Sequence, residues 1–120
     1  MFHLIRRALT NGVVTTAYPD EPDPAPEAYR GQVTIDPARC VGTGDCARVC
    51  PSQAIRVLHD EHGGWLWELD DARCVFCGLC QDVCPVNAIQ LSNEYELATR
   101  HASHLVTRVI FRLKDGGERA

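Results

Sequence analysis

Seven cysteines, arranged in two runs, carry the chemistry of this sequence. The complete run has the spacing C-x2-C-x2-C-x3-C-P and consists of Cys74, Cys77, Cys80, Cys84 and Pro85. The other run has the same spacing except for one position, and consists of Cys40, Thr43, Cys46, Cys50 and Pro51. Thiolates at this spacing are ligands for a 4Fe–4S cluster. We therefore expect two iron–sulfur sites, one of which lacks a cysteine.

The spacing also predicts how the cysteines divide between the two sites. In a two-cluster protein the fourth cysteine of such a run, which precedes proline, ligates the other cluster. The expected ligands of a [4Fe-4S] cluster at site B are Cys50, Cys74, Cys77 and Cys80. The expected ligands at site A are Cys40, Cys46 and Cys84, with Thr43 at the vacant corner. All seven cysteines are thus predicted metal ligands.

Thr43 leaves three outcomes open for site A. The site holds a [3Fe-4S] cluster, an incompletely cysteine-ligated [4Fe-4S] cluster with water, hydroxide or the Thr43 oxygen on its fourth iron, or no cluster. We favour [3Fe-4S], because a neutral hydroxyl is a poor iron ligand beside thiolates. Asp45 is a weaker candidate for the fourth corner, since it directly precedes Cys46.

Zinc sites and disulfides explain these cysteines less well. Zinc needs four ligands around one ion, usually from paired C-x2-C knuckles, and the present runs exceed that need. A disulfide framework favours an even number of cysteines, and this chain has 7.

An internal repeat predicts the elements that position the cysteines. Asp36, Cys40, Cys46 and Cys50 are matched 34 positions later by Asp70, Cys74, Cys80 and Cys84 (70 − 36 = 34). Each copy predicts a strand, a cysteine loop, a short helix ended by proline, and a second strand. These strands are expected at 33–35, 54–58, 65–69 and 88–91, and the helices near 46–50 and 80–84. The prediction is an α+β, bicluster bacterial ferredoxin-like fold with a pseudo-two-fold internal repeat.

The repeat divides the chain into three parts. Residues 33–92 form the expected bicluster domain, whose small core needs the clusters for stability. Residues 1–32 combine an amphipathic helix over 2–9 with a proline-rich, acidic linker. That helix packs on this domain or docks on a partner subunit or the membrane interface, which its arginines suit. Residues 93–120 are a docking extension, where Val106, Val109, Ile110 and Leu113 favour an amphipathic helix and a strand remains the alternative.

Composition narrows the classes of function. The formal net charge of −4 argues against a nucleic-acid partner. No stretch has the length of a transmembrane helix, and the thiols indicate a cytoplasmic protein. No nucleophile and base are paired in the sequence, so we expect no catalytic site and no small-molecule substrate.

Residues that flank the cysteines add a resemblance to a known family. These residues are Tyr18-Pro19, Tyr29-Arg30-Gly31, Trp65-Leu66-Trp67 and the stretch from Asn93 to Ala98. With the cysteine runs, they resemble the iron–sulfur electron-transfer subunit of formate hydrogenlyase-type (group 4) membrane hydrogenases, which is related to the two-cluster subunit of respiratory complex I. The resemblance implies an electron relay in a hydrogenase or complex I-like assembly, peripheral to the inner membrane. The alternative is a free, soluble 7Fe-type ferredoxin that carries electrons by diffusion.

Overall fold

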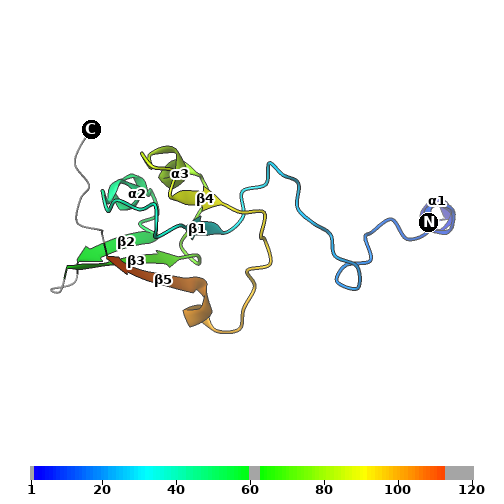
Figure 1. The fold of residues 1–120 in the computed structure, drawn as a ribbon. Coiled ribbons are helices and arrows are strands. Elements are labelled where there is room, and N and C mark those ends of the chain that lie inside the picture. Colours follow the sequence, from blue (N-terminus) through cyan, green and yellow to red (C-terminus); the bar gives the residue numbers. More distant parts are fainter. Residues whose placement is uncertain (1, 60–62, 113–120) are drawn as a thin grey trace.

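A computed structural model describes residues 2–59 and 63–112 (Figure 1). Its helices are α1 (Phe2–Asn11), α2 (Asp45–Val49), α3 (Leu79–Asp82) and the 3-10 helix η1 (Ala102–Leu105). Its strands are β1 (Val33–Ile35), β2 (Ile55–His59), β3 (Gly64–Asp70), β4 (Ile89–Leu91) and β5 (Val106–Arg112). The strand–helix–strand order that was predicted for each copy of the repeat is therefore present.

The strands of the two copies pair with each other rather than within a copy. β1 pairs antiparallel with β4, so that Ile35 lies opposite Ile89. β2 pairs antiparallel with β3, so that Ile55 lies opposite Leu69. Ile35 and Leu69 are 34 positions apart, as are Ile55 and Ile89, so equivalent residues meet in both pairs. Neither copy forms a complete sheet alone.

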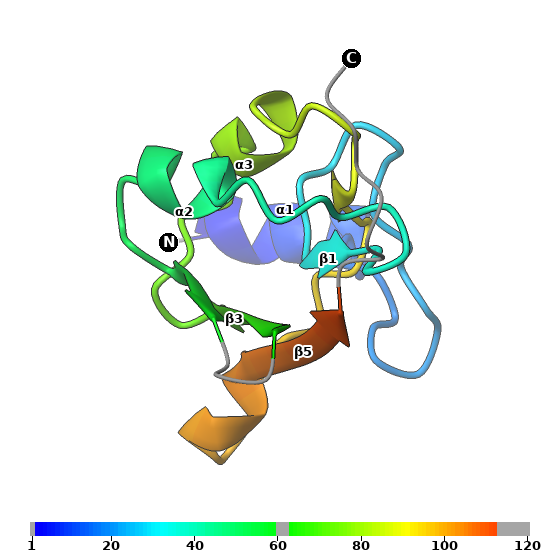
Figure 2. The ribbon, with the colours of Figure 1, turned by 60° about the vertical axis from the view of Figure 1, so that its left-hand side comes forward.

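The core lies between the short helices and the strands. Figures 1 and 2 show α2 and α3 together on one side of the β2–β3–β5 sheet. The most deeply buried large side chains, Trp67 and Leu69, both come from β3. The residues packed with them include Val33, Ile55, Cys80, Ile89 and Phe111. The cysteine loops therefore close over an apolar core that both copies build.

The C-terminal extension is a strand over residues 106–112, so the favoured prediction of an amphipathic helix is wrong there. β5 pairs with β3 along its whole length, from Val106 opposite Asp70 to Arg112 opposite Gly64. Burial alternates along β5, since Phe111 is buried and Ile110 is 78% exposed. A helix would have placed Val109 and Ile110 on one face. Leu113, the fourth residue of the predicted apolar face, lies outside the described residues.

The N-terminal residues extend away from the cluster domain. The molecule measures 73 × 32 × 26 Å, and α1 lies at the far end of its long axis (Figure 1). α1 buries none of its residues, and its apolar side chains Phe2 and Leu9 are 89% and 81% exposed. The prediction of a helix here is confirmed, and α1 does not pack on this domain. Within the described ranges, no helix has the length and apolar character needed to span a bilayer.

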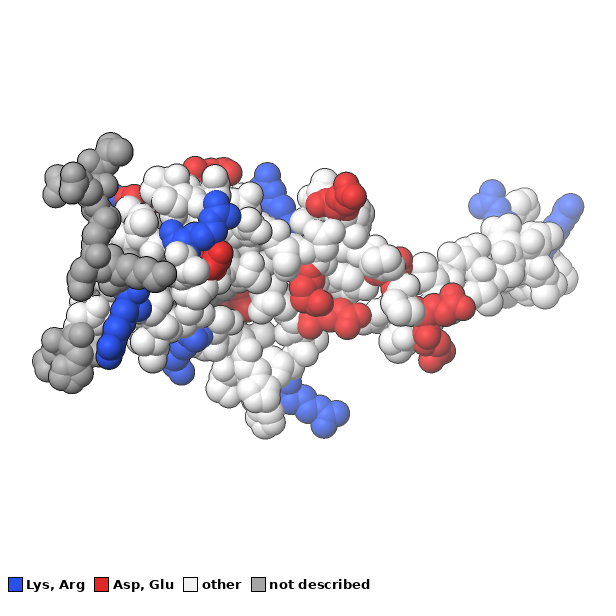
Figure 3. All heavy atoms as spheres, in the orientation of Figure 1, with Lys and Arg blue, Asp and Glu red and all other residues white. Residues whose placement is uncertain are grey.

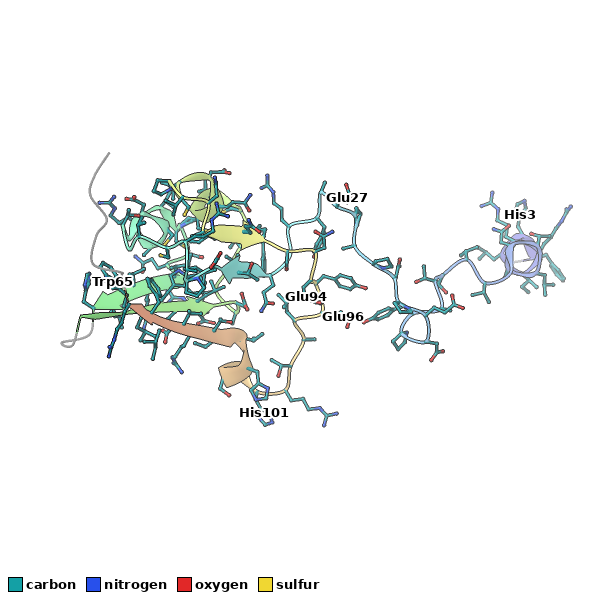
Figure 4. All side chains as sticks on the ribbon, in the orientation of Figure 1. His3, Glu27, Trp65, Glu94, Glu96 and His101 are labelled. Carbon is teal, nitrogen blue, oxygen red and sulfur yellow. The ribbon has the colours of Figure 1, made fainter. Side chains whose placement is uncertain are left out.

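Residues 18–32, here called the strap, lie between α1 and β1 in the chain and run beside residues 92–96. The Gly31 N–H donates to the Ser92 carbonyl at 2.8 Å, and the Gln32 N–H donates to the Glu94 carbonyl at 2.9 Å. The Tyr18 hydroxyl donates to Glu96 Oε1 at 2.9 Å. Figure 4 labels Glu27, Glu94 and Glu96 around this junction, and Figure 3 shows acidic side chains gathered between the domain and α1. The strap is a surface segment held by hydrogen bonds.

Candidate functional site

The seven cysteines line two small cavities of about 20 Å³ each. The first cavity, at site A, is lined by Cys40, Cys46 and Cys84, together with Thr43. The second, at site B, is lined by Cys50, Cys74, Cys77 and Cys80. Each cavity thus receives one cysteine from the opposite run, in the division that the spacing predicts. All seven are free thiols, and their ligation of iron stays a prediction.

The backbone bends that form the two cysteine loops occur at equivalent positions. Gly44 and Gly78 precede α2 and α3 with φ of 72° and 86°. Gly42 and Phe76 also have positive φ, at 69° and 51°. Glycine adopts this conformation at little cost, whereas a phenylalanine there is uncommon and is held by its surroundings. The bends wrap each loop around its cavity.

Backbone N–H groups point at the cysteine sulfur atoms. Ala54 N–H donates to Cys50 Sγ at 3.3 Å, and Ala88 N–H donates to Cys84 Sγ at 3.2 Å, which is the equivalent contact 34 positions later. Phe76 N–H donates to Cys74 Sγ at 3.4 Å. Such bonds stabilise a sulfur that carries negative charge. They fit thiolates that bind a metal cluster better than neutral thiols.

Burial at the sites gives a second test of whether a cluster fits. Burial raises the pKa of the Cys80 thiol to about 11. Burial also raises the pKa of Cys50, but hydrogen bonds from Ser52 and from backbone N–H groups outweigh it and lower that pKa overall. Burial therefore keeps the Cys80 thiol neutral, and its thiolate would form only beside positive charge, such as iron ions would supply. The donor set of site B, four sulfurs around one cavity, therefore fits a cluster.

No three His, Cys, Asp or Glu side chains in residues 2–59 and 63–112 gather tightly enough to hold a single metal ion. His101 and His104, which lie three positions apart, have ring centroids 5.4 Å apart, and both side chains are exposed. The cysteines instead surround two separate spaces, as described above.

At the vacant corner of site A, Thr43 lines the cavity and Asp45 has another partner. The Asp45 N–H donates to Thr43 Oγ1 at 3.5 Å. The Asp45 carboxylate forms an ion pair with Arg48 one turn along α2. This pairing disfavours Asp45 as a ligand for the corner and leaves Thr43 as the polar side chain there.

Two segments outside the repeat complete the sites, and the sequence alone did not predict either contact. Phe111 of β5 lines the cavity at site A, opposite Trp65 in the strand register. Arg30 of the strap donates from Nη1 to the Cys77 carbonyl oxygen at 2.8 Å, on the loop of site B. The only sequence signal was that Tyr29-Arg30-Gly31 belongs to the resemblance. Each site is therefore covered by a different extension.

A family model and two curated relatives match this chain. Residues 39–88 match the family model described as a 4Fe-4S dicluster domain. Over 99 residues the chain is 48% identical to formate hydrogenlyase subunit 6 of Escherichia coli K12. This match covers 82% of the present chain and 55% of the Escherichia coli protein. Over 45 residues it is 40% identical to F(420)H(2) dehydrogenase subunit I of Methanosarcina mazei, covering 38% of this chain and 25% of that one. The chain thus spans about half, or less, of these relatives.

A solved structure has a similar fold. It is the membrane-bound sulfane sulfur reductase, an archaeal respiratory membrane complex, and one of its chains matches with a TM-score of 0.61 and 32% identity. The match covers 83% of this chain and 53% of that chain. The similarity to formate hydrogenlyase-type subunits that the sequence predicted is confirmed, and residues 39–88 carry the cluster-binding part of it.

Proposed function

We propose that this chain, whose residues 39–88 match the 4Fe-4S dicluster domain model, is an electron-relay subunit of a membrane-associated hydrogenase or related respiratory complex. The observation that carries the proposal is the pair of cavities, each lined by cysteines of both runs. Bound iron–sulfur clusters would supply one-electron transfer, with no bond made or broken in a substrate. The relatives are named as complex subunits, which favours this function over a free ferredoxin.

The proposed ligand sets are the crossed ones. Cys50, Cys74, Cys77 and Cys80 hold a [4Fe-4S] cluster at site B, and Cys40, Cys46 and Cys84 hold the cluster at site A. The walls of the cavities are largely apolar, and the backbone N–H groups of Ala54 and Ala88 would stabilise the thiolates of Cys50 and Cys84. The strand pairing between equivalent residues supports a pseudo-two-fold relation between the two copies.

For site A we propose a [3Fe-4S] cluster, with Thr43 facing the missing iron. The pairing of Asp45 with Arg48 supports this, because it removes the carboxylate that would otherwise compete for the corner. The test is electron paramagnetic resonance of the oxidised, oxygen-protected protein. We expect a [3Fe-4S] signal that Thr43→Cys abolishes by completing a four-cysteine site, while Thr43→Ser leaves it. An intact protein with iron at both sites and no such signal would falsify this assignment.

The proposed partners are other subunits of the complex, at the cytoplasmic face of the inner membrane. α1 is exposed along its whole length, and its apolar and arginine side chains suit a subunit surface or the membrane interface. Purification of the chain from its native cells under mild detergent, followed by mass spectrometry, tests the proposal. We expect hydrogenase-type or respiratory subunits to co-purify, and a variant without residues 2–11 to lose them. A soluble monomer that reduces and oxidises partners by diffusion would instead indicate a free ferredoxin.

A further inference from the structure

Trp67 carries a buried polar group that finds no partner in the described part of the protein. Its side chain is only 1% exposed, and its indole Nε1 makes no hydrogen bond there. An unsatisfied buried donor destabilises the folded state. Buried donors are nearly always paired in native proteins, so this N–H needs an acceptor.

The environment of the indole indicates where that acceptor lies. Trp67 lines the cavity of site A together with Cys46 and Cys84. The side-chain acceptors in the lining of this cavity are the cysteine sulfurs and the Thr43 hydroxyl. Val57, Ile89 and Phe111 of the same wall offer no side-chain acceptor. The Thr43 hydroxyl already accepts from the Asp45 N–H at 3.5 Å, so the sulfurs of site A are the acceptors that remain for the indole.

Site B has no donor at the position equivalent to Trp67, and its polar side chain is instead Ser52, whose Oγ lies 3.6 Å from Cys50 Sγ. The position 34 residues before Trp67 is Val33 (67 − 34 = 33), which lines the cavity of site B and is 3% exposed. Val33 cannot donate a hydrogen bond from its side chain. The repeat thus places an indole N–H at one site and an aliphatic group at the other.

We propose that the Trp67 indole N–H donates a hydrogen bond to a sulfur atom of site A, and that it makes a cluster held there easier to reduce. This rests on the proposed function, because it needs a cluster at site A. One-electron reduction by an electron-transfer partner places extra negative charge on the cluster and its sulfurs. A donor fixed in a buried site stabilises that charge, and hydrogen bonds to the sulfurs are among the factors that set the potential of such clusters. Trp67 is therefore a residue that raises the potential of site A.

The first measurement is a redox titration of Trp67→Phe, followed by electron paramagnetic resonance. The substitution removes the N–H and keeps an aromatic ring in the core. We expect the equilibrium constant for reduction of site A to fall roughly tenfold, which is about 59 mV more negative for a one-electron couple. Site B should keep its potential. The matched control is Trp65→Phe, because Trp65 lies on the same strand but does not line the cavity; its ring packs behind the lining residue Gly42.

A second measurement does not require the Trp67 variant to fold. The chain has 2 tryptophans, so Trp65→Phe leaves Trp67 as the only one. Growth with ¹⁵N-labelled tryptophan should then give a ¹⁵N coupling in the pulsed resonance spectrum of site A. Absence of this coupling, or an unchanged potential of site A in Trp67→Phe, would overturn the proposal while leaving the relay intact. A wild-type protein that holds no iron–sulfur cluster would overturn both.

Discussion

Arg30 Nη1 lies 2.8 Å from the carbonyl oxygen of Cys77, to which it donates a hydrogen bond. The two residues are 47 positions apart, and the bond joins the strap to the loop that lines site B. A guanidinium next to this loop adds positive charge beside a site expected to hold an anionic cluster. The strap is thus both a connection to α1 and a part of the environment of site B.

The first prediction concerns this bond. Arg30→Gln should make the potential of site B more negative and speed the loss of its cluster in air, because it removes the charge and replaces the guanidinium donor with a neutral amide on a shorter side chain. Redox titration and the decay of visible absorbance measure these effects. Arg73→Gln is the matched control, since Arg73 carries the same charge directly before Cys74 and its side chain is exposed. Equal shifts in both variants would show that charge alone, and not the hydrogen bond, is responsible.

The second prediction concerns the attachment of the strap. A Cβ atom at Gly31 would lie 2.1 Å from the Glu94 carbonyl oxygen and 2.7 Å from that of Ser92. Gly31→Ala should therefore release the strap, at a cost of about 1–3 kcal/mol. Limited proteolysis of the cluster-loaded protein, read by mass spectrometry, should show faster cleavage within residues 12–30. Gly12→Asn is the control, because position 12 is open and asparagine tolerates its positive φ. Unchanged cleavage in Gly31→Ala would contradict the description of the strap.

The third prediction separates the two faces of β5. Phe111→Ala should lower the free energy of unfolding of the cluster-loaded protein by about 3 kcal/mol, because it opens a cavity beside site A. Ile110→Ala should change it by about 0.5 kcal/mol or less, since Ile110 is 78% exposed. Thermal denaturation under anaerobic conditions compares the two. Equal losses would mean that β5 does not present Phe111 to the core.

Strand β5 is the element whose conformation the sequence alone did not predict correctly. The cysteine spacing and the repeat were sufficient to predict strands near β1 to β4 and two short helices, because each copy carries its own turn residues and proline. The segment from Val106 to Arg112 fits a helical and an alternating pattern equally well. Its conformation depends on an open edge of β3, with which it pairs. That edge is a property of the assembled sheet.

For the candidate site, the sequence predicted which cysteines line each cavity but not the contacts that surround them. The cysteines that line each cavity follow from spacing, because a tight loop presents three sulfurs to one place. The contacts of Arg30, Phe111 and Trp67 join residues far apart in the chain, and no local pattern indicates them. The unmatched pair Val33 and Trp67 was visible in the repeat, but its meaning required the burial of the indole N–H.

The fourth prediction concerns removal of the clusters. Their ligands come from both copies, so the clusters link elements that a small core holds weakly. Anaerobic chelation of iron should therefore abolish most of the far-UV circular dichroism of the domain, and reconstitution should restore it. Identical spectra with and without iron would show that the apolar core is sufficient for the fold.

The central claim is that each cluster is completed by a cysteine from the opposite run, and Cys84→Ser tests it most directly. Electron paramagnetic resonance of the oxygen-protected variant should show loss of the site A signal, the one that Thr43→Cys alters, and an intact signal from the four-cysteine site. Cys84 would then serve Cys40 and Cys46 rather than its own run. Loss of the four-cysteine signal with site A unchanged would contradict crossed ligation and the account built on it.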